Sequence, residues 1–96
     1  MMVRIVENKI IVERTRATLE DLGVFEKAVD GLLAKGFKEI LVDFEATLNL
    51  PSEFLGYLMG KKKALQKDGK KLTIVAISEQ LRRLFNEARI SELMDV

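Results

Sequence analysis

The sequence predicts an α/β fold: a mostly parallel sheet of four to five strands, an antiparallel strand from an N-terminal hairpin, and three helices. Short β-rich runs alternate along the chain with segments whose apolar residues recur at helical spacing. Such alternation implies right-handed crossovers between parallel strands. The 96 residues, 48% of them hydrophobic, contain no linker, repeat or low-complexity segment, so we expect a single domain over residues 1–96.

The first predicted element is a hairpin. Its β-rich runs occupy residues 3–6 and 9–13, and Asn8 between them is a residue type that tolerates the backbone conformation of a tight turn. Because hairpin strands are antiparallel, we expect the first strand at an edge of the sheet.

The next segment predicts a helix. Thr18 is the expected cap, and Glu20 and Asp21 suit the positive end of the helix dipole. Gly36 has the position of the glycine that commonly ends a helix. The apolar side chains between them share one face and are Leu22, Phe25, Ala28, Val29, Leu32 and Leu33.

Residues 39–44 form a near-continuous apolar run, which predicts a central parallel strand covered on both faces. Pro51 and Ser52 mark the start of a second helix, with Ser52 as its expected cap. This helix carries Leu55, Leu58 and Leu65 and is expected to end near residues 68–69.

The last part of the chain predicts another strand and another helix. Residues 71–77 are the strand, and Ser78 is the expected cap of the helix. The inward side chains expected of that helix are Leu81, Leu84, Phe85 and Ala88. Residues 93–96 are expected to begin a last short strand.

The composition argues against several classes of function. The net charge is +1, so the charge balance does not point to nucleic acid or to an anionic membrane surface. The chain lacks cysteine and histidine, which removes thiolate chemistry, the commonest general base and the commonest metal ligand. We therefore expect a cytoplasmic protein that is not an enzyme, with no cofactor, no metal site and no insertion into a membrane.

A run of lysines has two interpretations. It comprises Lys61, Lys62, Lys63, Lys67, Lys70 and Lys71. It is either a site for phosphate or an acidic partner, or a solvated helix face with cations near the negative end of the dipole. We favour the solvated face, because acids elsewhere in the chain neutralise the total charge.

Several segments together resemble the STAS domain, the fold of bacterial anti-sigma-factor antagonists. They are residues 32–38 (LLAKGFK), 40–44 (ILVDF), 55–63 (LGYLMGKKK) and 68–75 (DGKKLTIV). The resemblance covers nearly the whole chain and implies the same fold. STAS domains commonly add a further strand and helix after the point that Val96 reaches, so we expect this chain to lack the usual final helix.

The family's signature lies where the central strand passes into the second helix. It usually reads Asp-Ser-Ser/Thr-Gly-Leu-Gly, and a partner kinase phosphorylates the second hydroxyl residue. The segment here, residues 51–56, reads PSEFLG. Leu55 and Gly56 keep the Leu-Gly end, and Ser52 matches the first serine.

The other signature positions differ, and Glu53 stands where the phosphorylated residue should be. Pro51 replaces the aspartate, and Phe54 replaces the glycine. Glu53 cannot accept phosphate, and its carboxylate supplies about −1 charge, against about −1.5 to −2 for a phosphoserine. It is either an inherited switch position with a permanent charge or an ordinary helix-stabilising acid, worth roughly 0.3–1 kcal/mol. A surviving kinase switch would place the phosphate on Ser52.

The resemblance implies a non-enzymatic protein-interaction module that docks through the start of the second helix. The expected partner-binding residues are Asn49, Pro51, Ser52, Glu53, Phe54 and Tyr57. Phe54 and Tyr57 give contact area if they are exposed, and the alternative for Phe54 is that it packs inward. The implied partner is an anti-sigma factor or a serine-kinase-like ATPase. The alternatives are a divergent STAS subunit of a transporter or signalling assembly, and a self-associating structural module. A bare sheet edge would favour a homodimer.

Overall fold

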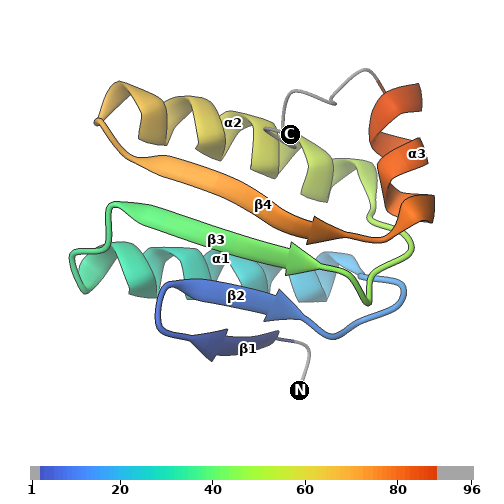
Figure 1. Ribbon diagram of the computed structural model, residues 1–96, viewed down its shortest axis with the longest axis horizontal. Coiled ribbons are helices and arrows are strands. Elements are labelled where there is room, and N and C mark those ends of the chain that lie inside the picture. The colour runs from blue at the N-terminus through green and yellow to red at the C-terminus, as the bar shows by residue number, and fades with distance from the viewer. Residues whose placement is uncertain (1–2, 89–96) are drawn as a thin grey trace.

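The computed structural model describes residues 3–88, which form a four-stranded sheet with two helices on one face and a third at one end (Figure 1). The strands lie in the order β1-β2-β3-β4, with β1 antiparallel to β2 and the other pairs parallel. The predicted fold class is therefore confirmed, and the strand expected at 93–96 lies outside the described residues. In chain order the elements are β1 (Val3–Val6), β2 (Lys9–Val12), α1 (Leu19–Ala34), β3 (Glu39–Phe44), α2 (Ser52–Lys67), β4 (Lys71–Ile77) and α3 (Glu79–Glu87).

The hairpin turn differs from the prediction in one residue. Glu7, not Asn8, takes the left-handed conformation, with φ 55°. The amide of Asn8 is used elsewhere, because its Nδ2 donates a hydrogen bond of 2.8 Å to the backbone oxygen of Glu39. Asn8 thus ties the hairpin to the start of β3.

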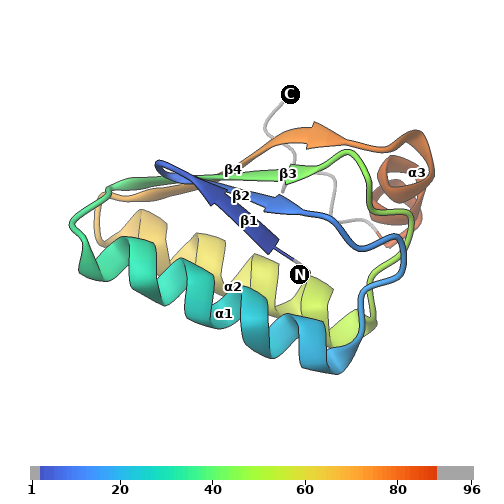
Figure 2. The same cartoon turned by 90° about the horizontal axis from the view of Figure 1, so that it is seen from below.

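Both crossover helices lie on one face of the sheet, as Figure 2 shows. Two successive right-handed crossovers that add strands in the same direction place their helices on the same side. In β3, Ile40, Val42 and Phe44 are fully buried, while Leu41 and Asp43 on the opposite face are half-buried. The expected coverage of β3 on both faces is therefore wrong within residues 3–88.

The start of α1 is fixed by a reciprocal pair of hydrogen bonds. The backbone nitrogen of Asp21 donates to Oγ1 of Thr18 (3.2 Å), and that of Thr18 donates to the Asp21 carboxylate (2.8 Å). Asp21 is 5% exposed and also forms an ion pair with Arg14, with a Nε–Oδ2 distance of 3.3 Å. The predicted cap is confirmed.

Glycines end α1 and α2 in the same way. Gly36 and Gly69 have φ of 95° and 72°, a region that side chains with a Cβ avoid. The nitrogen of Gly36 donates to the oxygen of Leu33 (3.0 Å), and that of Phe37 donates to Leu32 (3.3 Å). This pair of bonds satisfies carbonyls at the helix end that would otherwise lack partners.

Two glycine substitutions should have opposite effects on stability. Gly36→Ala should lower the free energy of unfolding by about 1–2 kcal/mol, because alanine would be forced into the left-handed region. Gly60→Ala, on an open stretch of α2, should raise it by about 0.5–1 kcal/mol. Urea unfolding measures both, and equal signs would contradict this account of the helix ends.

Three phenylalanine rings form the centre of the core. The Phe25 ring lies 5.0 Å from that of Phe54 and 6.2 Å from that of Phe44, between centroids, and the Phe44 and Phe54 rings are 6.1 Å apart. All three are fully buried. They join α1, β3 and the first turn of α2, so the start of α2 is anchored to the sheet through its own side chain.

Candidate functional site

At the carboxyl end of the parallel strands, backbone hydrogen bonds join two separate loops into one surface. The backbone nitrogens of Leu48 and Asn49 both donate hydrogen bonds to the backbone carbonyl oxygen of Thr15, at 2.8 and 3.2 Å. The nitrogen of Ala17 donates to the oxygen of Asn49, at 3.2 Å. The β2–α1 loop (residues 13–18) and the β3–α2 loop (residues 45–51) are therefore fixed to each other. We call this surface the carboxyl edge.

Thr47 connects the carboxyl edge to α3. Its side chain is fully buried and donates from Oγ1 to the oxygen of Val12 at 3.4 Å. Its own carbonyl accepts a hydrogen bond from Oγ of Ser78. The same Ser78 oxygen accepts from the nitrogen of Leu81 at 3.1 Å, which confirms the predicted cap of α3. Sequence reasoning missed Thr47, because a hydroxyl residue after a strand looks like any loop residue.

Three of the predicted partner-binding residues are exposed together at the carboxyl edge: Asn49, Ser52 and Glu53. The cap of α2 is Pro51, which is half-buried and makes no side-chain hydrogen bond, so the capping role expected of Ser52 is wrong. The helix starts at Ser52, and its hydroxyl donates to Oε1 of Glu53 at 3.3 Å. Ser52 and Glu53 are thus neighbours in one exposed polar pair.

The two aromatic residues among the predicted partner-binding residues, Phe54 and Tyr57, point away from that surface. Phe54 is fully buried, so the structure selects the inward alternative and the contact area expected of Phe54 is wrong. Phe54 is three residues before Tyr57 and four before Leu58, so these side chains line the inner side of α2. Tyr57 packs edge-on against Phe25 with 6.1 Å between ring centroids.

Tyr57 occupies the seam between α1 and α2. Burial raises the pKa of its hydroxyl above the ordinary value, with smaller contributions from the carboxylates of Asp30 and Glu26. The hydroxyl oxygen is buried and has no hydrogen-bond partner among residues 3–88. The phenol is therefore a neutral packing group.

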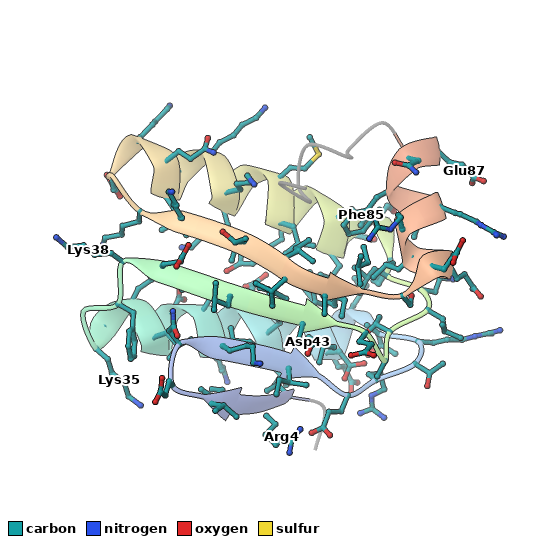
Figure 3. All side chains as sticks on the ribbon, viewed as in Figure 1. Arg4, Lys35, Lys38, Asp43, Phe85 and Glu87 are labelled. Atoms are coloured by element: carbon teal, nitrogen blue, oxygen red, sulfur yellow. The ribbon has the colours of Figure 1, made fainter. Side chains whose placement is uncertain are left out.

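A hollow of about 260 Å³ lies where the β3–α2 loop meets α3. Leu48, which is 37% exposed, and Leu84 give it an apolar part. Figure 3 shows Phe85 directed from α3 into the molecule, while Glu87 points outward. Ala88, the C-cap of α3, is exposed, so the inward position expected of it is wrong. The lining residues are Leu48, Asn49, Gln80, Arg83, Leu84 and Glu87. Sequence reasoning placed only Asn49 in the site, because the approach of α3 to this loop depends on tertiary structure.

The lysine run divides between several environments. Lys61 forms an ion pair with Asp30 of α1 (Nζ–Oδ1 3.5 Å), and Lys63 and Lys67 are exposed. Lys62 is only 8% exposed, so the solvated-face interpretation does not hold for it. Lys62, Lys70 and Lys71 line a hollow of about 640 Å³ near the amino end of β4, away from the carboxyl edge.

The described residues contain no group of three or more acidic, histidine or cysteine side chains that is suited to hold a metal ion. Within the same range, no helix is long and apolar enough to cross a membrane.

Comparison with known proteins identifies relatives. The chain matches no protein-family model. It is 31% identical over 71 residues to the anti-sigma-B factor antagonists of Staphylococcus aureus strains NCTC 8325, COL and Mu50. The alignment covers 74% of this chain and 66% of each relative, so the chain spans just under two thirds of the length of the relatives. From this similarity, and from the sheet order and crossovers described above, we conclude that the chain belongs to the STAS, or anti-sigma-factor-antagonist-like, family.

Proposed function

We propose that this chain is a non-enzymatic regulatory module that docks onto an anti-sigma factor and so acts on transcription in the bacterial cytoplasm. The observation that carries the proposal is the similarity to proteins named as anti-sigma-B factor antagonists. It is supported by a carboxyl edge whose loops are bonded into one surface, where polar and apolar groups are exposed together. A single STAS domain over residues 1–96 is part of this proposal.

The proposed docking surface differs from the one read from the sequence. It keeps Asn49, Ser52 and Glu53, which are exposed, and leaves out Phe54 and Tyr57, which pack inward. In their place it takes the walls of the hollow beside α3, where Leu48 is the exposed apolar group. An apolar side chain within a polar rim is the common composition of a protein interface.

Glu53 is proposed to act as a permanent charge at the position that other family members phosphorylate. Its side chain is exposed in the first turn of α2, so the charge is directed toward an approaching partner. Phosphorylation releases the partner in the family, and a fixed carboxylate should therefore weaken docking without any kinase. Ser52 keeps a hydroxyl beside it, and its proposed role is to hydrogen-bond Glu53.

Binding to a purified anti-sigma-B factor tests this function by isothermal titration calorimetry. The unsubstituted chain should bind, and Glu53→Gln should bind roughly 5–10-fold more tightly, because the isosteric amide removes an unpaired interfacial charge worth about 1 kcal/mol. Leu48→Lys should weaken binding by at least about tenfold. Val75→Lys is the matched control, because Val75 is 49% exposed on β4 and lies outside the proposed surface.

Two results would reject the proposal. No binding by the unsubstituted chain or by Glu53→Gln would remove the anti-sigma factor as partner. Equal losses in Leu48→Lys and Val75→Lys would remove the carboxyl edge as the surface.

A divergent STAS subunit of a transporter or signalling assembly is the second candidate. The glutamate at position 53 favours it, because a constitutive subunit needs a docking surface but no phosphorylation cycle. Affinity capture from the source cell discriminates between the two candidate functions. Recovery of an ABC-transporter subunit would support the second candidate, and recovery of a kinase-like ATPase would support the first.

A further inference from the structure

The edge strand β1 exposes apolar side chains on both of its faces. Ile5 is 46% exposed and Val6 is 49% exposed, although both lie in a paired strand. Ile5 pairs with Ile10, which is fully buried, and residues directly opposite in antiparallel strands share a face. Ile5 therefore points toward the helix layer and is still half uncovered.

The face of α1 at this margin is also partly uncovered. On α1, Val24 is 41% exposed, while its neighbour Phe25 is fully buried. Asp30 faces α2 through its ion pair with Lys61, and helical geometry places Val24 on the other side of Phe25 from Asp30. Figure 2 shows β1 and α1 along the same margin of the molecule. Ile5 and Val24 thus leave an apolar strip at the β1 margin.

The two outer strands of the described sheet, β1 and β4, differ in how far they are protected against pairing with a strand of another chain. Lysines 70 and 71 stand at the start of β4, and its register with β3 shifts near Val75. Charges and bulges of this kind are common protections of an edge. β1 has neither a lysine nor a proline nor a register shift in its pairing with β2, and its sequence is Val-Arg-Ile-Val. Its one charged residue, Arg4, is directed outward at the margin of the molecule (Figure 3). Arg4 forms an ion pair with Glu13, with a Nε–Oε1 distance of 3.7 Å.

We propose that the occupant of this margin is a second copy of the chain, whose β1 pairs antiparallel with β1 about a two-fold axis at Ile5. With the axis at Ile5, the two Ile5 side chains face each other and each Arg4 faces a Val6. With the axis at Arg4, two arginines would oppose each other directly, which is unfavourable. An axis at Val3 or Val6 would pair only that single residue of β1 with the β1 of the other copy, whereas the axis at Ile5 pairs residues 4–6. Charge and paired length together therefore select the Ile5 register. In this arrangement the two sheets become one, both helix layers lie on the same side, and the paired isoleucines cover the strip beside Val24.

The chain contains no cysteine, so single cysteines report on this register without interference. Directly opposite residues have Cα atoms about 4.5–5.5 Å apart, within disulfide range. Ile5→Cys should therefore form a covalent dimer rapidly under mild oxidation. Val6→Cys is the matched control on the same strand, because its two copies would be roughly 8 Å apart, too far to bridge. Equally fast crosslinking of both variants would overturn the proposal.

Analytical ultracentrifugation supplies the second readout. The unsubstituted chain and Val75→Lys should both sediment as dimers at concentrations of tens to hundreds of micromolar, and Ile5→Lys should sediment as a folded monomer. A monomeric unsubstituted chain throughout that range would overturn the proposal. The inference is independent of the anti-sigma factor, because β1 contributes no residue to the carboxyl-edge surface proposed above.

Discussion

Phe54→Ala should lower the free energy of unfolding by about 3–5 kcal/mol, the range typical of a buried phenylalanine that is truncated to alanine. The ring is fully buried and contacts Phe25 and Phe44, at centroid distances of 5.0 and 6.1 Å. Truncation removes its transfer free energy and leaves a cavity between α1, α2 and β3. Denaturant unfolding followed by circular dichroism measures the loss.

The neighbouring exposed residue supplies the control for Phe54. Glu53→Ala should change the free energy of unfolding by no more than about 1 kcal/mol, because only a helix-dipole contribution is lost. If Phe54→Ala costs as little as Glu53→Ala, the ring is not the anchor of α2. The result also bears on function: a docking assay on Phe54→Ala measures folding before it measures contact.

Ser78→Ala should lower the free energy of unfolding by about 2 kcal/mol. The hydroxyl has two roles. It accepts a hydrogen bond from the backbone nitrogen of Leu81 as the cap of α3, and it donates a hydrogen bond to the carbonyl of Thr47. Loss of a cap costs about 1 kcal/mol, and a carbonyl left without its donor costs a similar amount. Hydrogen exchange should show faster opening of α3 in this variant.

Ser52→Ala is the matched control for Ser78→Ala. Both serines stand at the start of a helix, but Ser52 is exposed and caps nothing. Its replacement should change stability by less than about 0.5 kcal/mol. Equal effects in the two variants would mean that neither the cap of α3 nor the hydrogen bond from Ser78 to Thr47 contributes to stability.

The parts of the fold that sequence predicted well are those with local causes. Thr18 and Asp21 cap α1 through bonds within four residues, and Gly36 ends it through its own backbone conformation. The residues on the inner face of α2 are harder to predict from the sequence. Leu55, one of the leucines that mark this helix in the sequence, is half-buried, while Phe54 one residue earlier is fully buried. A rotation of one residue about a helix cannot be read from a short apolar cluster, although the spacing of Phe54, Leu58 and Leu65 contained the signal.

The parts of the site that were missed depend on segments distant in sequence. Thr47 is buried only because β2 and α3 approach it, and the hollow beside Leu48 exists only because α3 packs there. The one-sided cover of β3 has a similar origin. A near-continuous apolar run fixes the strand, but the path of the chain decides which face receives helices.

The bonds that Thr15 and Asn49 make across the carboxyl edge have an energetic consequence for recognition. A loop that is disordered before binding must lose conformational freedom when it docks, at roughly 1–2 kcal/mol for each residue that becomes fixed. Here that loss has already been met during folding, so binding immobilises side chains and little backbone. Differences in affinity between partners should then follow the identity of a few exposed side chains, and the edge should approach each partner in the same preorganised shape.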